Sequence, residues 1–425
     1  MHKRVGTLNQ REDNLRWTIE MGDEEVTNEN TDTRERILNA ARLLTQKPST
    51  SNYTLNQLAD QLDLHYTALY HYFKNRDELE TELIERYCQR RLDHLNGVQR
   101  QPHNAYQQLA EFIRLEMHEP PTQLLSRGID LFSEPFRTRA THAYENNRRE
   151  LTTLIQRGTE DGSIRPCSAQ ITAIIILRIL NRFANQHEQV LAKAGLDADA
   201  LTEQIISYIS HGILAQAYPA KEIMDRALLT FPSSENSHSN LELILRTLTR
   251  AFNDRGFSAT SIPEVAASIG LSKTSLYRFA GSKEELLFLC SQRSLELLNQ
   301  VRQISKIITS SPLEALLHNL YFERHLANAP PGPLLRTAMH QFLTPAHQRV
   351  VADSHTTTRY EMISLLERGI SEGCFRDLNA QAVQPMLHAI SLLRFTREEN
   401  DPGAGLMDDI ASFVLKGIAN EPIQS

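Results

Sequence analysis

Hydrophobic side chains recur at every third or fourth position through nearly the whole chain after Thr31, whereas no convincing run alternates between hydrophobic and polar residues. The first pattern is typical of amphipathic helices and the second would have indicated strands. The apolar stretch from Ile171 to Leu180 is too short to cross a membrane and contains Arg178. The pattern therefore predicts an all-α protein.

One motif of hydrophobic and polar positions occurs twice. Leu64-His-Tyr-Thr-Ala-Leu-Tyr70 and Leu271-Ser-Lys-Thr-Ser-Leu-Tyr277 stand 207 residues apart, and so do Ile37 and Ile244. The spacing is that of a helix-turn-helix, in which the second helix enters the major groove of DNA. Because operators are usually bound by paired modules, a chain with both copies could supply the pair by itself.

Capping signals support the repeat independently. A polar residue followed three positions later by Glu or Gln forms a capping box, in which each side chain binds a free backbone amide of the first turn. Such pairs precede three expected helices in each half: Asp32 and Glu35, Thr54 and Gln57, Asn75 and Glu78, then Ser239 and Glu242, Ser261 and Glu264, Ser282 and Glu285.

The duplication extends beyond the motifs and predicts the domain boundaries. Leu154–Arg165 resembles Leu365–Arg376, and a final amphipathic helix recurs at Leu201–Ala215 and Leu406–Ala419. We expect a disordered tail at residues 1–30, a first helix-turn-helix domain at 31–79, a first helical ligand and dimerisation domain at 80–218, a linker at 219–239, a second helix-turn-helix domain at 240–286 and a second helical domain at 287–425. Residues 31–218 and 240–425 are called the first and second halves below.

Composition narrows the function classes. The net charge of −7 excludes a protein that coats nucleic acid through a generally basic surface, so contact with DNA must be local. The four cysteines form no C-x-x-C pair, and the basic start Met1–Arg4 has no apolar segment after it. Both observations indicate a cytoplasmic protein without a membrane segment and with reduced thiols.

The second motif carries the clearer chemistry for binding DNA. Gly270 can adopt the positive φ of the tight turn, and Ser272 can cap the following helix. Lys273, Thr274 and Ser275 are suited to base edges. Tyr277 and Lys283 are placed to contact phosphates. We also expect Ser261 and, in the first copy, Thr54 to take part in DNA binding.

Both halves resemble TetR-family transcriptional regulators. The segment 269–286 is similar to the DNA-binding motif of that family, 62–79 is similar in a weaker form, and the family's R-G-x-x-E-G-x-F-R pattern occurs at Arg368 and more loosely at Arg157. The resemblance implies two tandem units, each with an N-terminal three-helix helix-turn-helix domain and a C-terminal helical domain for ligand binding and dimerisation.

The first copy departs from the family pattern. Asp63 replaces the turn glycine, His65 the capping serine, and Tyr66 a small or basic residue; in the second copy Ala280 replaces a phenylalanine. Residues 53–79 carry a net charge of −2, against 0 for residues 260–286. Since phosphate neutralisation supplies much of the affinity, we expect the second copy to bind DNA more strongly. The first would contact bases with His65, Tyr66 and Thr67, and phosphates with Tyr70 and Arg76.

The resemblance also implies a dimer and an effector. The last two helices of each half would pack together, so that the chain forms a monomeric pseudo-dimer on an imperfectly palindromic, double-stranded operator; a homodimer with four DNA-binding domains is the alternative. A small-molecule effector would release the DNA, which favours a repressor. Side chains that could line its cavity, but also suit an ordinary core, are Phe112, Met117, Phe132, Phe136, Tyr321, Phe322, Met339 and Phe342.

The sequence shows no motif typical of an enzyme or of a metal-binding protein. The sequence contains no P-loop, G-x-S-x-G or H-E-x-x-H motif, and His65 and His71 have no third ligand near them. We therefore expect neither an enzyme nor a metal or cofactor. Two hypotheses remain, a ligand-responsive DNA-binding regulator and an all-helical ligand-binding or protein-interaction module whose DNA-binding domains have decayed.

Overall fold

The computed structural model of the chain describes residues 29–46, 53–118, 132–215, 240–328, 332–391 and 406–420. Within these ranges the chain is helical, and its only β-pairings are two isolated bridges. The predicted all-α fold is thereby confirmed. Of the predicted tail, residues 1–28 lie outside the described residues, as does the whole predicted linker at 219–239.

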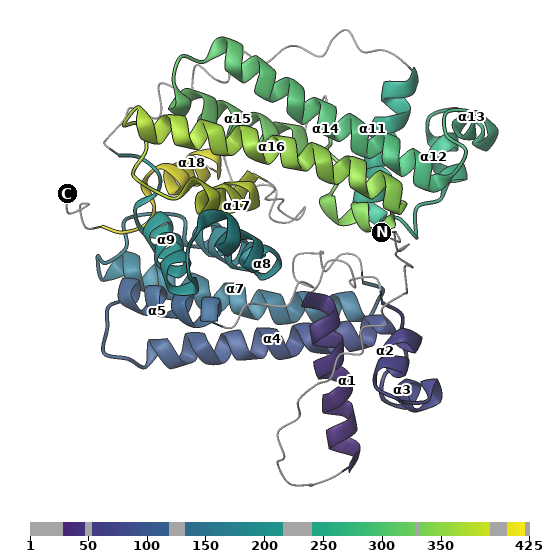
Figure 1. Cartoon of the computed structure of the whole chain (residues 1–425), viewed down its shortest axis with the longest axis horizontal. Helices are drawn as coiled ribbons and strands as arrows, with labels where there is room; N and C mark the ends of the chain where they lie inside the picture. The colour runs from purple at the N-terminus through teal and green to yellow at the C-terminus, as the bar shows by residue number, and fades with distance from the viewer. Residues whose placement is uncertain are drawn as a thin grey trace, which may run out of the picture.

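Short helices at the start of each half lead into long ones (Figure 1). The first half contains α1 (Glu29–Gln46), α2 (Leu55–Gln61), α3 (Tyr66–Tyr72), α4 (Arg76–Gln99), α5 (Ala105–His118), α7 (Phe136–Glu160), α8 (Ala169–Ala194) and α9 (Ala198–His211). The second contains α11 (Asn240–Arg255), α12 (Ile262–Ser268), α13 (Lys273–Tyr277), α14 (Lys283–Ile308), α15 (Pro312–Asn328), the 3₁₀ helix η3 (Thr337–Phe342), α16 (Pro345–Ser371), α17 (Ala380–Ser391) and α18 (Leu406–Lys416).

Three main hydrophobic cores hold these helices together. One core lies within α1–α4 with the start of α7, and a second lies within α11–α14 with η3 and the start of α16. The largest core draws side chains from both halves, including Phe183 of α8 and Phe413 of α18. Each helix-turn-helix thus has a core of its own, and both are attached to a shared helical body.

The two halves meet through their last helices. α8 packs against α17 and α18, and α9 packs against α17 and α18. Figure 1 shows these four helices between the long helices α4, α5 and α7 on one side and α14–α16 on the other. Burial of apolar surface is the main driving force for packing. The core shared by the two halves therefore stabilises their contact.

Matched backbone contacts join the halves in both directions. Ile164 bridges Ala419, and Leu214 bridges Phe375. Beside each bridge an arginine of one half binds a glycine of the other: Arg165 Nε donates to Gly417 O at 2.6 Å, and Arg376 Nη1 donates to Gly212 O at 2.9 Å. The same contact is therefore made twice, with the roles of the two halves exchanged.

Some predicted helix ends need correction. α1 begins at Glu29, three residues before the expected cap Asp32, so Asp32 lies inside the helix. The expected final helices are also shorter, since α9 ends at His211 and α18 at Lys416. Gly212 and Gly417 each take a φ of 63°, and this left-handed geometry turns the chain out of the helix and into the contact between the halves.

Candidate nucleic-acid interface

The two helix-turn-helix motifs have the same backbone design. The turn after α2 passes through Asp63 at φ 53° and the turn after α12 passes through Gly270 at φ 71°, which confirms the predicted left-handed positions. After each turn an amide reaches back to the preceding helix: Leu64 N donates to Ala59 O and Leu271 N to Ala266 O, both at 2.9 Å. Asp63 therefore adopts the same left-handed geometry as Gly270, although only glycine does so without strain.

Most of the expected caps are confirmed. Thr54 accepts from Gln57 N while Gln57 Oε1 accepts from Thr54 N, which completes the capping box. Ser261, Asn75 and Ser282 accept from the backbone N of Glu264, Glu78 and Glu285, which is the N-cap half of each expected capping box. These caps fix where α2, α12, α4 and α14 begin.

The recognition helices α3 and α13 expose most of the predicted DNA-binding side chains. Figure 1 shows α3 and α13 on the same side of the molecule. Tyr66 and Tyr70 are 53% and 46% exposed. Of the predicted set, the exposed members are Thr54, His65, Tyr66, Thr67, Tyr70, Ser272, Lys273 and Thr274, and the half-buried ones are Arg76, Ser261, Ser275, Tyr277 and Lys283.

Two of the expected phosphate ligands have partners within the protein. Arg76 Nε donates to Glu80 Oε1 at 2.8 Å and Arg76 Nη1 donates to Tyr53 O at 3.1 Å. Lys283 Nζ lies 3.3 Å from Ser258 O and over the ring of Phe257, and partial burial lowers its pKa. Arg76 therefore holds the first turn of α4, and its guanidinium is less available to a phosphate than predicted.

The cap of each recognition helix differs between the halves. Ser272 Oγ accepts from Ser275 N at 3.1 Å, whereas His65 Nδ1 accepts from Thr67 N at 3.4 Å and lies 2.8 Å from Thr67 Oγ1. His65 therefore does replace the capping serine, but through a longer contact that also engages a predicted base-contacting hydroxyl. No residue pattern in the chain indicated that a ring nitrogen would act as the cap.

Removing the two caps is expected to have unequal effects. Ser272→Ala should lower the free energy of unfolding by about 1 kcal/mol, because a short N-cap bond is lost. His65→Ala should cost less, since its contact with Thr67 N is long. Urea denaturation followed by circular dichroism measures both variants. A larger loss for His65→Ala would show that the histidine is the stronger cap.

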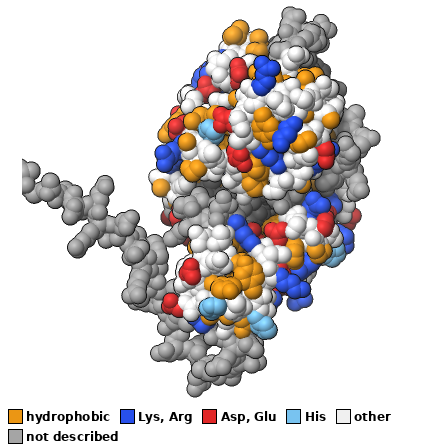
Figure 2. All heavy atoms as spheres, turned by 90° about the vertical axis from the view of Figure 1, so that its right-hand side faces the viewer, with side chains coloured by type: hydrophobic (Ala, Val, Ile, Leu, Met, Phe, Trp, Pro, Cys, Tyr) orange, Lys and Arg blue, Asp and Glu red, His pale blue; other side chains and the backbone are white. Residues whose placement is uncertain are grey.

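Charge on this side of the molecule is mixed. Figure 2 looks onto the side that carries α3 and α13, and its basic side chains are interspersed with acidic and hydrophobic ones. On α13, Lys273 is exposed and its Nζ lies 5.7 Å from the centre of the Tyr277 ring. Residues 53–79 remain acidic by two charges relative to 260–286. A cation is therefore available at the start of α13 but has no counterpart on α3.

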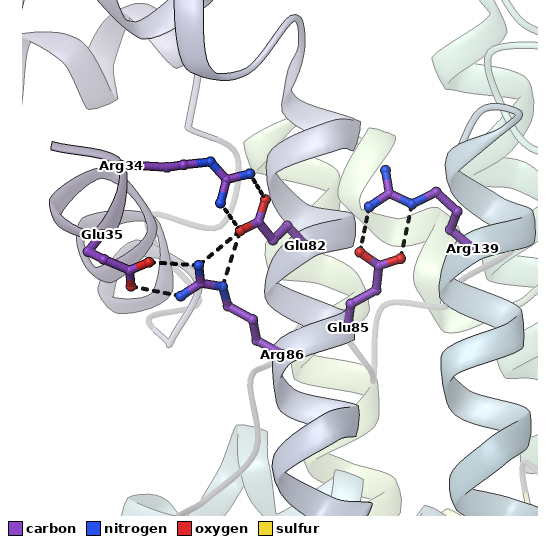
Figure 3. Close-up of polar contacts among 6 residues, drawn as sticks. All are labelled: Arg34, Glu35, Glu82, Glu85, Arg86 and Arg139. Carbon is purple, nitrogen blue, oxygen red and sulfur yellow. Dashed lines mark hydrogen bonds and ion pairs between the residues drawn. The ribbon is translucent and has the colours of Figure 1, made fainter. Parts of the chain in front are cut away.

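Ion pairs attach each helix-turn-helix to its long helix. Arg86 of α4 forms a double hydrogen bond with Glu35 of α1, each contact 2.7 Å long, and also pairs with Glu82, which binds Arg34 (Figure 3). Figure 3 also shows Glu85 of α4 bound to Arg139 of α7. These pairs link α1, α4 and α7 into one unit.

The second half repeats the central pair. Arg293 of α14 binds Glu242 of α11, with Nε 2.9 Å from each carboxylate oxygen. Arg86 and Arg293 stand 207 residues apart, as do Glu35 and Glu242. Glu35 and Glu242 were expected to complete capping boxes with Asp32 and Ser239; they instead bind these arginines, and Ser239 lies outside the described residues. The shared offset of 207 residues between the two arginines and between the two glutamates could have indicated these ion pairs from the sequence.

The side chains expected to line an effector cavity belong to packed cores. Phe112, Met117 and Tyr321 contribute to the shared core, whereas Phe132 and Phe136 pack in the first helix-turn-helix core. Met339 and Phe342 pack in the second helix-turn-helix core, and Phe322 in a small cluster with Val301. None of the eight lines the cavities of the second half described below. All eight pack in these cores, and their place in an effector cavity stays a prediction.

Two further findings limit the chemistry of the described residues. They contain no group of three or more His, Cys, Asp or Glu placed to hold a metal ion. Within the same ranges, no helix combines the length and hydrophobicity needed to span a bilayer. Cys88 and Cys290 are buried, and Cys167 and Cys374 are half-buried, all four as free thiols.

Comparison with known proteins identifies one of the two motifs. Residues 244–290 match the profile of "Bacterial regulatory proteins, tetR family". No curated protein matches the chain. Similar solved structures include AibR in complex with isovaleryl coenzyme A and operator DNA (18% identity, TM-score 0.37, 42% of this chain and 98% of that one). Others are PfmR from Thermus thermophilus (24%, 0.33, 40% and 96%) and KstR2 of Mycobacterium tuberculosis (21%, 0.37, 45% and 100%). The chain therefore carries, at residues 244–290, the helix-turn-helix DNA-binding domain of the tetR family of bacterial regulatory proteins.

Proposed function

We propose that this chain is a ligand-responsive transcriptional regulator, most simply a repressor, that binds operator DNA and has no catalytic role. The observation that carries the proposal is the second helix-turn-helix. Its recognition helix α13 is capped by Ser272 and presents Lys273 and Thr274 to solvent, within the segment that matches the family profile. Exposed polar residues on the first turn are what base contact requires.

We assign the contacts as follows. Lys273, Thr274 and Ser275 approach base edges, while Ser272, Ser261, Tyr277 and Lys283 position the backbone. In the first motif His65, Tyr66 and Thr67 make the weaker base contacts, with Tyr70 and Thr54 at phosphates. Because Tyr66 and Thr67 cannot contact the same bases as Lys273 and Thr274, the operator would be an imperfect palindrome.

We further propose that the two halves act as a pseudo-dimer within one chain. The proposal is supported by the packing of α8 and α9 on α17 and α18. It is also supported by the exchanged contacts of Arg165 with Gly417 and of Arg376 with Gly212. A two-fold contact between identical subunits has this reciprocal form. Six units, from the tail at 1–30 to the second helical domain at 287–425, remain the proposed domain division.

The salt dependence of binding tests the assignment of Lys283 to a phosphate. On DNA from upstream of its own gene, affinity should fall as salt rises, and Lys283→Met should flatten the slope of log affinity against log salt by about 0.9, because one phosphate contact is lost. Fluorescence anisotropy measures the slope. Lys416→Met, at the exposed end of α18, is the matched control and should leave it unchanged.

Molar mass by light scattering tests the pseudo-dimer. A mass near 48.4 kDa with one duplex per chain supports pairing within the chain, and twice that mass indicates a homodimer. A chain that binds no DNA in a salt-sensitive way would instead favour the helical interaction module, a candidate to which the acidic first motif and the internal pairing of Arg76 point.

A further inference from the structure

Each half has an arginine facing a glutamate between its two long helices, and a cavity lies beside this pair only in the second half. In the first half Arg91 of α4 meets Glu116 of α5, with Nε 2.7 Å from Oε2. In the second half Arg302 of α14 faces Glu323 of α15, with Nη1 3.6 Å from Oε1. Glu116 and Glu323 stand 207 residues apart, the offset of the repeat, whereas Arg91 and Arg302 stand 211 apart, about one helical turn further along. The two glutamates therefore correspond, and each faces an arginine from a different turn of the preceding long helix.

The first-half position is closed. Tyr87 OH donates to Glu116 Oε2 at 2.7 Å, and His94 Nδ1 lies 2.9 Å from Glu116 Oε1. Arg91 also donates to Asn181 Oδ1 at 3.1 Å. The side chains of Arg91 and Glu116 have no exposed surface. Arg91 is thus bound by Glu116, Tyr87 and Asn181, although its Nη1 makes no hydrogen bond to any described residue.

The second-half position is hollow. Two adjoining cavities, of about 190 and 30 Å³, share Asn319 and Met362 as lining residues. Arg302 lines the larger one, and its side chain is only 6% exposed. It donates to Thr358 Oγ1 at 3.0 Å, but its Nε and Nη1 make no hydrogen bond to any described residue. Asn319 Oδ1 is likewise buried without a donor there. Such groups are costly unless a ligand completes them.

Two carboxylates lie close to Arg302, and neither completes its hydrogen bonds. Burial raises the pKa of Glu323 despite the charge of Arg302. Glu361 Oε2 lies 3.2 Å from Arg302 Nε but outside hydrogen-bond geometry, and Glu361 Oε1 accepts from Lys306 Nζ at 2.7 Å. The pKa of Glu323 is therefore raised, and Glu361 divides its charge between two cations.

Further basic groups surround the cavities. Arg182 reaches this region from α8 of the first half, and burial with repulsion from Arg359 lowers its pKa to about 10. Burial, followed by the charges of Arg182 and Arg302, lowers the pKa of His355. The pKa of His388 is lowered by burial and by Arg182, His355 and Arg302. Because a lowered pKa favours the neutral imidazole, the positive charge here comes from Arg182 and from the three cations that line the larger cavity, Arg302, Lys306 and Arg368. This charge favours a negative ligand.

We propose that the chain has a single effector site, in the second half, and that it takes one small organic acid per chain. The carboxylate of the ligand would complete the hydrogen bonds of Arg302, and its carbon skeleton would lie against Met362 and Leu365, which line the same cavity. The inference rests on the proposed function, whose effector it assigns to a chemical class and to one half.

The position of Arg302 also suggests how the acid acts on DNA binding. α14 begins at Lys283, beside the second helix-turn-helix, and carries Arg302 in its last turns. Glu242 and Arg293 tie α11 to the same helix. A ligand that moves α14 at Arg302 therefore moves the domain that presents Lys273. By linkage, it weakens DNA binding only if it prefers the shifted state.

Calorimetric titration of the full chain with butyrate, hexanoate, octanoate and decanoate tests the site. We expect at least one acid to bind at one molecule per chain, and the alcohol of the same length not to bind. Arg302→Met should weaken binding about tenfold or more, which is roughly 1.4 kcal/mol. Asn319→Leu, which removes an unsatisfied buried group and should fold well, should weaken binding too. Arg157→Met, in a shallow recess of the first half, is the control and should change nothing.

Several results would overturn the inference: two acids bound per chain, no binding of any acid at millimolar concentration, or unchanged affinity in both Arg302→Met and Asn319→Leu. The DNA titration is run in parallel so that the two proposals fail separately. Salt-sensitive DNA binding without acid binding would contradict only the proposed effector site. Binding of one acid per chain without DNA binding would contradict the proposed regulator and support the acid-binding site.

Discussion

Replacing Gly417 with alanine is expected to lower the free energy of unfolding by roughly 3 kcal/mol or more, because the new methyl group would collide with backbone. A Cβ at this position would lie 2.3 Å from the carbonyl carbon and oxygen of Ser210 in the other half. The residue also has a φ of 63°, which non-glycine residues adopt only with strain. Gly212 meets the backbone of Leu415 in the same way, so Gly212→Ala should behave alike.

Gly373→Ala tests the effect of backbone strain at a positive φ without a steric collision of the new methyl group. Gly373 has a φ of 70°, and an alanine methyl group there would meet no atom within 4 Å, so this variant should lose only about 1–2 kcal/mol. Chemical denaturation measures all three variants. If Gly417→Ala and Gly373→Ala lose the same stability, the close approach between the halves does not contribute.

Glu116→Gln is expected to cost about 3–5 kcal/mol, because it leaves the buried guanidinium of Arg91 without a counter-charge. Burial alone would raise the pKa of Glu116. The charge of Arg91 and hydrogen bonds from His94, Tyr87 and Arg91 outweigh that effect and lower it to about 2. Since the folded pKa is depressed, this contribution to stability is fully present above the unfolded value of 4.5 and is lost as pH falls toward 2.

Unfolding measured between neutral pH and pH 2 checks this expectation. The variant should start less stable and should lack the part of the acid-dependent loss that lies between about 4.5 and 2. Glu111→Gln is the control, because Glu111 forms a surface pair with Arg114 and should cost below about 1 kcal/mol. An unchanged acid dependence in Glu116→Gln would show that this pair does not set it.

Local chemistry made much of the interface predictable from the sequence. The caps at Thr54 and Ser261 and the left-handed turns at Asp63 and Gly270 depend on residues a few positions apart, so their types and spacing were enough. Glu35 shows the limit of this approach. A carboxylate three residues after a polar residue suits a capping box and a distant arginine equally well, and only packing brings Arg86 to it.

The interior was predictable only in part, for a related reason. Phe112 and Met117 were candidates for a cavity because they are large and apolar, but such residues fill space and usually end in a core. The hollow position of the second half is lined by Arg302, Asn319 and Glu361, which come from three helices and are polar. No spacing along the chain marks residues that become neighbours only after folding.

Because the reciprocal contacts between the halves lie within one chain, the pairing of the halves does not depend on protein concentration. Two separate subunits dissociate when their concentration falls, so their joint affinity for a two-part target falls with it. Here Arg165 and Gly417 belong to one polypeptide, as do Arg376 and Gly212, and their encounter is intramolecular. Their effective concentration is set by chain connectivity rather than by expression level. Under the proposed pseudo-dimer, a cell holding only a few copies of this protein would still hold every copy in its paired form.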